Sequence, residues 1–476
     1  MPKFSINRTL PLVAISLPVA VGACNKYEMF RLSGYEQVSF SSEVDVLFVI
    51  DGSSSMSDEA GALLRNFDDF IETVAGGSGA GNATESLTDA VGDYISFTAD
   101  RGRITDYRLA ITTASMDAKD AWSLEPEGGE TGLFVGDDGF QVVYKGDDNA
   151  VHQFKQNLGC WGACWNGAEM PTNSSYIGTT GDCPFPDSNG DGVVDNNDEV
   201  TTQYLDCLCT DVSYPEGEDW DAIELCRAGN ELHLESTLMA LCRATEDPPE
   251  ICYHTKDSTD FPFEDSWIGT NTDWMRPDST VVVVYVTDEG DQSEAVVGGL
   301  FSGSEDDPQV YIDAFEQFDR PIRFAAIGPD LICEGDNNCS FPCNSGGASA
   351  TGVKRLQKLA ASTGGFYNPI TSGDGDDCPV SDFSVHLKDL GKLLINLQSA
   401  FELQSTPDET TIRAYVDDEE VDKATVNEST GEYTNGWSYE PGQNAVVFWG
   451  SAIPDFNQDV RIYYRPLDGK PRDLPF

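Results

Sequence analysis

The residues of this chain best suited to chemistry follow two apolar runs, and their side chains carry oxygen atoms. The run at 44–50 leads into Asp-Gly-Ser-Ser-Ser, and the run at 281–286 leads into Thr-Asp-Glu-Gly-Asp. Apolar, β-branched runs are typical of buried strands in parallel sheets, and ligands bind beyond the carboxyl ends of such strands. A hard-oxygen site that suits Mg²⁺ or Mn²⁺ is therefore predicted where the two runs end. Its candidate ligands are Asp51, Ser53, Ser55 and Asp288.

The types of these ligands indicate what the site would do. Asp51, Ser53 and Ser55 are two positions apart, so a turn can direct all three side chains to one point. Serine hydroxyls coordinate a cation without cancelling its charge, so a site with few carboxylates leaves the ion electrophilic. Such an ion can accept a carboxylate from a partner in its open coordination position. The expected partner is a protein ligand that binds through an acidic side chain.

The Asp-x-Ser-x-Ser loop after a buried strand resembles the metal-ion-dependent adhesion site of von Willebrand factor A (VWA) domains, as found in integrins and related adhesins. The resemblance covers roughly residues 42–403. The chain particularly resembles exported VWA lipoproteins of myxobacteria and their relatives. In those proteins, as after the run at 281–286 here, a late strand leads into a Thr-Asp-Glu-x-Asp-x-Ser segment. The resemblance implies a doubly wound, Rossmann-like α/β domain that binds a protein ligand through Mg²⁺, in adhesion or envelope assembly.

One position departs from the family pattern. VWA domains usually supply a metal-coordinating Thr from a loop before the middle helix. The equivalent stretch here, 228–231, reads Ala-Gly-Asn-Glu, and Thr237 lies inside the helix that follows. Asn230 or Glu231 is the expected substitute. A Glu at this position would add negative charge and make the cation a weaker acceptor for an acidic partner.

Apolar periodicity predicts the elements that position these residues. Strands are expected at 44–50, 107–113, 279–287, 322–327 and 365–367, and helices at 58–74, 231–244, 310–318, 353–362 and 385–403. Strands that alternate with helices indicate a doubly wound α/β domain with a mostly parallel sheet. Residues 121–228 are rich in Gly, Asp and Cys and show little periodicity, which predicts an insertion pinned by disulfides. Further strands at 411–416, 444–449 and 460–464 predict a small all-β domain over 408–476.

The predicted insertion contains a candidate calcium loop. Oxygen ligands at loop positions 1, 3, 5, 7, 9 and 12, with Gly192 at position 6, resemble EF-hand and dockerin-type loops. The ligands are Asp187, Asn189, Asp191, the carbonyl of Val193, Asp195 and Asp198. Position 12 is Asp rather than the longer Glu. We expect Ca²⁺ here to be structural and to order the insertion.

The N-terminus predicts export and a lipid anchor. Lys3 and Arg8 accompany an apolar run at 10–20 that is too short to span a bilayer as a helix, and Val-Gly-Ala-Cys24 follows it. This pattern resembles a bacterial lipobox, which implies a signal peptide at 1–23, acylation of Cys24 and a tether at 24–41. Asn25, in place of Asp, favours the outer membrane, on its periplasmic or cell-surface face. Apart from Cys24, the chain has 12 cysteines, an even number that an oxidising compartment can pair.

Charge and histidine content narrow the function classes. With 82 acidic and 28 basic residues, the formal net charge is -54, which disfavours nucleic acid as a partner. None of the four histidines lies in a His-Glu-x-x-His motif and no Gly-x-Ser-x-Gly occurs, so an enzyme is not expected. Two alternatives remain open. One is a structural envelope scaffold whose VWA site is inactive, and the other is a hydrolase with its site in the Cys-rich insertion.

Overall fold

The computed structural model describes twelve stretches of the chain and two isolated residues, 165 and 452. The stretches are 43–75, 106–116, 130–163, 183–209, 231–254, 267–293, 308–333, 339–343, 348–373, 378–425, 435–449 and 460–467, with gaps at 137–138, 146, 148, 195–197, 272–273, 278, 319, 321, 404, 418 and 442–443. The predicted signal peptide, Cys24, the tether, Asn230 and Asp195 lie outside the described residues.

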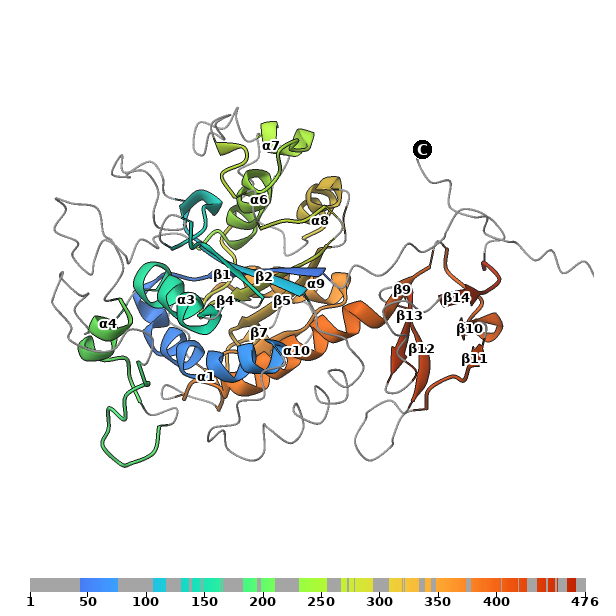
Figure 1. The fold of residues 1–476 in the computed structure, drawn as a ribbon. Helices are drawn as coiled ribbons and strands as arrows, with labels where there is room; N and C mark the ends of the chain where they lie inside the picture. The colour runs from blue at the N-terminus through green and yellow to red at the C-terminus, as the bar shows by residue number, and fades with distance from the viewer. Residues whose placement is uncertain are drawn as a thin grey trace, which may run out of the picture. The chain divides into compact units, whose positions relative to one another are not determined.

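A six-stranded sheet with the order β3-β2-β1-β4-β5-β8 is the centre of the fold (Figure 1). Its strands are β1 (Glu43–Ile50), β2 (Asp106–Thr113), β3 (Val142–Tyr144), β4 (Thr280–Val286), β5 (Ile322–Gly328) and β8 (Tyr367–Pro369). β3 runs antiparallel to β2, and the other neighbours are parallel. The sequence prediction of a mostly parallel α/β sheet is confirmed. The chain moves outward from β1 on one side and returns to β4 on the other, so β1 and β4 flank the switch point.

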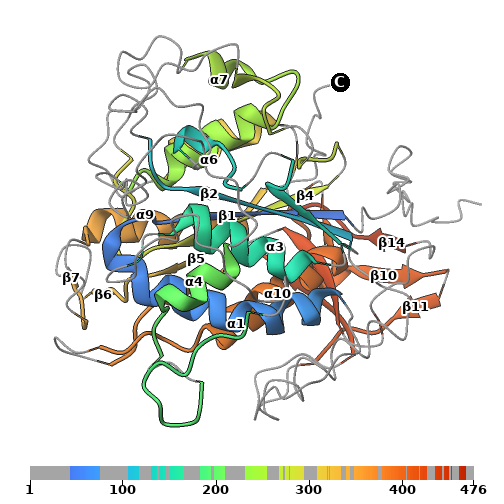
Figure 2. The ribbon, with the colours of Figure 1, turned by 60° about the vertical axis from the view of Figure 1, so that its left-hand side comes forward.

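Helices cover both faces of this sheet (Figure 2). α1 (Ser57–Ala75), α3 (Ala150–Gln156), α4 (Thr202–Leu208) and α10 (Phe383–Ser399) lie on one face, and α6 (His233–Arg243), α7 (Glu250–His254), α8 (Gln309–Phe315) and α9 (Ala350–Thr363) on the other. β1 supplies both cores, because Val46 and Phe48 face the first layer while Leu47 and Val49 face the second. Burial on both faces explains why residues 46–50 of this strand are all apolar, while the buried Asp45 is paired with Arg276.

Part of the stretch predicted as an insertion belongs to the α/β core instead. β3 extends the sheet by pairing with β2, and α3 places the fully buried Phe154 against Phe48 and Phe67. A π-helical segment, Asn157–Gly162, follows and is also buried. Residues 130–162 of the range predicted as an insertion therefore pack into the α/β core, as α4 of the same range does. A strand of three residues and a helix of seven are too short to give a periodic signal.

Five disulfides join described cysteines. They are Cys160–Cys209, Cys183–Cys207, Cys242–Cys252, Cys333–Cys339 and Cys343–Cys378. Disulfides limit the conformations of the unfolded chain and persist in oxidising compartments, so this pattern is typical of exported proteins. No helix in the described part of the chain is long and apolar enough to cross a membrane.

The C-terminal strands form two antiparallel sheets of three strands, β12-β13-β9 and β11-β10-β14. Their bounds are β9 (Ala400–Glu402), β10 (Arg413–Val416), β11 (Glu419–Val421), β12 (Gly436–Glu440), β13 (Ala445–Trp449) and β14 (Val460–Tyr463). Phe401, Ile412, Trp437 and Phe448 share one apolar cluster. β9 begins before the predicted boundary at 408, inside the range predicted as the last helix. Neither β11 nor β12 was predicted, because both are short, although Trp437 and Tyr439 of β12 do alternate with polar residues.

The placement of residues 130–162 in the core generates a stability prediction. Phe154→Ala removes a fully buried ring and should lower the free energy of unfolding by about 3–5 kcal/mol, measured by urea unfolding. Phe140→Ala is the matched control, because 59% of that residue is exposed, and it should change stability little. Equal effects of the two substitutions would show that α3 is not part of the core.

Candidate cation site

The backbone brings the two polar strand ends together at the switch point of the sheet. β1 and β4 are neighbours, and Ile50 pairs with Val286 at the last position of both strands. The backbone N–H of Asp51 donates to the Val286 carbonyl at 2.9 Å, which extends the ladder by one step. The loops that begin at Asp51 and Thr287 therefore start side by side.

Side chains of the first loop converge on one point. Asp51 is fully buried, and its Oδ1 accepts a hydrogen bond from the Ser53 backbone N–H at 2.9 Å. The hydroxyls of Ser53 and Ser55 are 2.8 Å apart. The Thr287 hydroxyl donates to Asp51 Oδ2 at 3.0 Å and so fixes the carboxylate from the second loop. Thr287 was not among the predicted site residues, although it directly precedes one of them.

Asp288 completes the predicted group of four. It hydrogen-bonds with Ser55 and lies against Asp51, whose carboxyl shares a hydrogen bond with it. Burial, followed by the charge of Asp288, raises the pKa of Asp51 from 3.8 to about 7. Burial also raises the pKa of Asp288. Among the described residues, nothing donates a hydrogen bond to the buried Oδ1 of Asp288. The structure therefore leaves a buried carboxylate oxygen at this point without a donor, which is unfavourable unless a ligand compensates for it.

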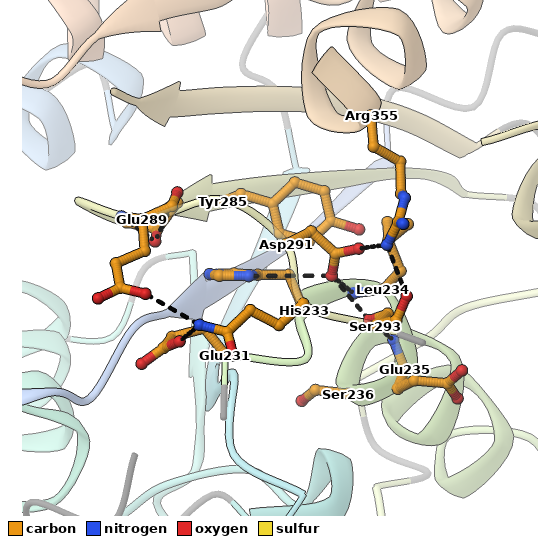
Figure 3. A network of polar contacts seen from close by, with 12 residues as sticks. Glu231, His233, Leu234, Glu235, Ser236, Tyr285, Glu289, Asp291, Ser293 and Arg355 are labelled. Carbon is orange, nitrogen blue, oxygen red and sulfur yellow. Dashed lines mark hydrogen bonds and ion pairs between the residues drawn. The ribbon is translucent and has the colours of Figure 1, made fainter. Parts of the chain in front are cut away.

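Glu231 reaches the site from the start of α6. Its backbone carbonyl accepts from the Gln292 N–H at 2.8 Å, and its carboxylate accepts from the Gln292 side-chain amide. The same amide donates to Glu289 Oε2 at 2.9 Å (Figure 3). Burial, then the charge of Asp51, raises the pKa of Glu231 to about 8. The charges of Glu231 and Asp51 therefore disfavour one another.

Thr237 does not serve as the missing hydroxyl. It lies on α6, where its Oγ1 hydrogen-bonds with the His233 carbonyl at 2.7 Å and the Tyr285 hydroxyl at 3.0 Å. Both hydrogen bonds of its side chain are therefore made to α6 and β4.

Glu59, in the first turn of α1, is a further acidic residue at the site that the sequence analysis missed. Only 6% of Glu59 is exposed, and its Oε2 has no hydrogen-bond partner within the described residues. Burial, then the charges of Asp288, Asp58 and Asp51, raises its pKa to about 8. An acidic residue in the first turn of a helix is common, because it interacts favourably with the helix dipole, so its type and position gave no special signal.

The donor set suits a hard cation such as Mg²⁺. Glu59 Oε2 and Asp288 Oδ1 are buried carboxylate oxygens without a donor among the described residues. Asp288 hydrogen-bonds with Ser55, whose hydroxyl is 2.8 Å from that of Ser53. No group of three or more His, Cys, Asp or Glu side chains in the described stretches is arranged to hold a metal. The site would therefore combine two carboxylates, Asp51 and Asp288, with hydroxyls and water, as Mg²⁺ sites commonly do.

The candidate calcium loop is folded around its first residue. Asp187 Oδ1 accepts from the N–H groups of Gly190 at 2.8 Å and Asp191 at 3.1 Å, and its Oδ2 accepts from Gly192 at 2.9 Å. Both glycines have positive φ, 74° and 91°, which explains their place in this turn. Asp198 Oδ1 closes the loop by accepting from Ser188 N at 2.7 Å.

The remaining candidate ligands of this loop differ in position. Asn189 Oδ1 accepts from Asp191 N at 2.9 Å, and Asp191 Oδ1 accepts from Val193 N at 2.8 Å. Val193 is 60% exposed. The structure therefore brings positions 1 to 7 and 12 into one compact loop, while Asp195 lies outside the described residues.

Models of known protein families give no match to this chain, and no curated protein sequence matches it.

The raised pKa values generate a prediction for pH. Asp51 and Glu59 titrate at about 7 and about 8 when folded and near 4 when unfolded, so their contribution to stability is present below about pH 4 and is lost as pH rises through 7 to 8. The Tm of the metal-free protein should therefore fall between about pH 4 and pH 8. Glu59→Gln should reduce that fall, while Asp313→Asn on the exposed surface should not. Parallel curves for wild type and Glu59→Gln would contradict the assignment.

The loop geometry generates a second prediction. Chelation of Ca²⁺ should increase proteolytic cleavage between Cys183 and Cys207, measured by mass spectrometry of the products, because the clustered carboxylates of Asp187 and Asp191 repel one another without a cation. The double variant Asp187→Ala/Asp191→Ala should be cleaved equally with and without chelator. Cleavage of the wild type that ignores the chelator would argue against calcium in this loop.

Proposed function

We propose that this chain is a lipid-anchored, exported VWA-type protein that binds a protein ligand through a Mg²⁺-dependent site. The observation that carries the proposal is the buried, donor-free Oδ1 of Asp288 beside Asp51 and two serine hydroxyls at the switch point of the sheet. A buried carboxylate oxygen without a donor is unfavourable, and a hard cation bound between it and the nearby hydroxyls would compensate for that cost. Mn²⁺ would fit the same ligands.

Each side chain has a distinct task in this proposal. Asp51 and Asp288 would hold the cation, and Ser53 and Ser55 would complete its ligand set without further charge. Thr287 orients Asp51 through its 3.0 Å hydrogen bond. A bound Mg²⁺ supplies an electrophilic coordination position, at which an acidic side chain of the partner would bind.

Fold and disulfides support the wider assignment. The switch point between β1 and β4 is a point at which α/β sheets bind ligands, which supports the proposal of a VWA-type domain with a Cys-rich segment and a small C-terminal β domain. Five disulfides fit an exported protein. Acylation of Cys24 would anchor the chain to the outer membrane, with adhesion or envelope assembly as its role. Ca²⁺ in the loop at 187–198 would be structural.

A scaffold with an inactive site is the second candidate, and Glu231 is the observation that favours it. Its charge and that of Asp51 disfavour one another, and in a VWA-type site Glu231 would take the place of a hydroxyl ligand. A third carboxylate would neutralise the cation and weaken its attraction for an acidic partner. A site that binds a cation and a protein ligand is supported by the presence of all four predicted ligands, Asp51, Ser53, Ser55 and Asp288.

The hydrolase alternative has its site in the Cys-rich insertion, and it stays a prediction because residues 117–129, 166–182 and 210–230 lie outside the described stretches. Outside the insertion, one group of His, Asp and Ser side chains can be compared with a catalytic triad. His233, Asp291 and Ser293 lie together, but the Ser293 hydroxyl donates to Asp291 at 2.7 Å and not to His233. His233 Nδ1 is 4.0 Å from Asp291, and all three side chains are buried. This is not the order of contacts that activates a nucleophilic serine, so a binding role is proposed in place of catalysis.

Calorimetric titration of Mg²⁺ and Mn²⁺ tests the proposal. The wild type should bind both ions, and Asp51→Ala/Asp288→Ala should bind neither. The double variant should keep or raise the Tm of the metal-free protein, because it removes two carboxyls that burial disfavours. Asp313→Asn, an exposed acidic position, is the control and should bind as the wild type does. A wild type that binds neither ion would leave the scaffold as the better account.

A further inference from the structure

We infer that Asp291, Ser293 and Arg355 form a buried clasp that positions Glu231, and with it one side of the candidate cation site. The three residues join the loop after β4 to the starts of α6 and α9 (Figure 3). The effect of the clasp on cation binding rests on the proposed function, whereas its effect on α6 does not. Asp291 and Ser293 follow Asp288 in the same loop, and neither is among the proposed cation ligands.

α6 depends on the clasp because it has no cap of its own. Leu232 occupies the N-cap position, and its apolar side chain cannot accept hydrogen bonds from the backbone N–H groups of the first turn. Asp291 Oδ1 instead accepts from the Leu234 N–H at 3.1 Å, and Ser293 Oγ accepts from the Glu235 N–H at 3.3 Å. A carboxylate at this end also interacts favourably with the helix dipole. The loop after β4 therefore caps α6 from a distant part of the chain.

Arg355 of α9 holds the clasp in place. Its Nη1 donates to Asp291 Oδ2 at 2.6 Å and to the Ser293 carbonyl at 2.6 Å. Asp291 is 2% exposed and Arg355 is 5% exposed, so both charges are withdrawn from water. The Ser293 hydroxyl donates to Asp291 Oδ1 at 2.7 Å. Buried polar networks of this kind favour one geometry when every member is satisfied.

The backbone of the loop is equally confined. A Cβ at Gly290 would lie 2.7 Å from the Ser349 carbonyl oxygen, and a Cβ at Gly352 would lie 2.4 Å from the Asp291 carbonyl oxygen. Two glycines thus allow the start of α9 to touch residues 290–291 directly. The loop is fixed by α6 on one side and by α9 on the other.

The same loop carries Asp288 and touches Glu231. Gln292 lies between the two clasp residues of the loop, and its backbone N–H donates to the Glu231 carbonyl at 2.8 Å. Its side-chain amide joins the carboxylates of Glu231 and Glu289. A loosened clasp would let Glu231 move away from Asp51 and Asp288. The clasp therefore sets how close a third carboxylate lies to the cation.

Hydrogen exchange and Mn²⁺ titration of the full chain test this inference together. Ser293→Ala removes the cap on Glu235 without changing charge. It should speed amide exchange at 234–235 and weaken Mn²⁺ binding about 5- to 10-fold, the effect of losing about one hydrogen bond. Arg355→Lys keeps the ion pair with Asp291 and should retain most of the Mn²⁺ affinity. Arg355→Met removes the ion pair and should lower the Mn²⁺ affinity more than Arg355→Lys does. Asp382→Ala, which removes a side-chain acceptor at the start of α10, is the matched control and should change neither quantity at α6.

The outcomes separate this inference from the proposed function. Asp288→Ala should abolish Mn²⁺ binding with exchange at 234–235 unchanged, which distinguishes a ligand from a positioning residue. If Ser293→Ala lowers the Tm but leaves both exchange and Mn²⁺ affinity at wild-type values, the clasp is overturned. If the wild type binds no Mn²⁺, the proposed function fails, and exchange alone decides: faster exchange in Ser293→Ala upholds the clasp, and unchanged exchange overturns it.

Discussion

The parallel pairing of β1 with β4 is the constraint on which the rest of the structure depends. The register ends with Ile50 opposite Val286, and the Asp51 N–H adds one more hydrogen bond to the Val286 carbonyl. A shift of one residue would turn the side chains of a strand to the opposite face, which two apolar layers forbid here. Because both strands are buried on both faces, their register is fixed, and the polar loops that follow them must meet. The candidate site is a consequence of how the core packs.

Electrostatics at this meeting point is unfavourable without a counter-charge. Asp51, Glu59 and Asp288 all have raised pKa values, first because burial removes water and then because like charges are close. Hydrogen bonds from Ser53, Ser55 and Thr287 offset part of this cost for the two aspartates. Carboxyls arranged in this way are typical of functional sites rather than of structural ones. Glu231 adds negative charge and would make a bound cation less attractive to an acidic partner.

α6 begins two residues after Glu231, and contacts with other parts of the chain fix both of its ends. Its start is capped by the loop after β4, and its end is tied to α7 by Cys242–Cys252. Arg243, also at its end, donates to the Thr131 carbonyl at 2.8 Å and lies over the Trp267 ring. Cross-links of three kinds thus limit how far the helix can move. A site assembled from separate loops requires such support, because none of its loops alone fixes the relative position of the ligands.

The sequence by itself determined the alternation of strands and helices, the two strand ends that carry Asp51 and Asp288, and the even number of cysteines apart from Cys24. These features are local, because apolar runs and loop motifs act within a few residues of one another. Only the tertiary structure decided that β3 and α3 belong to the core, which cysteines pair, and that Glu59, Thr287 and Gln292 lie at the site. Contacts between residues far apart in the chain define these features. Asp291 shows the difference most clearly, since its partners Leu234 and Arg355 are 57 and 64 positions away.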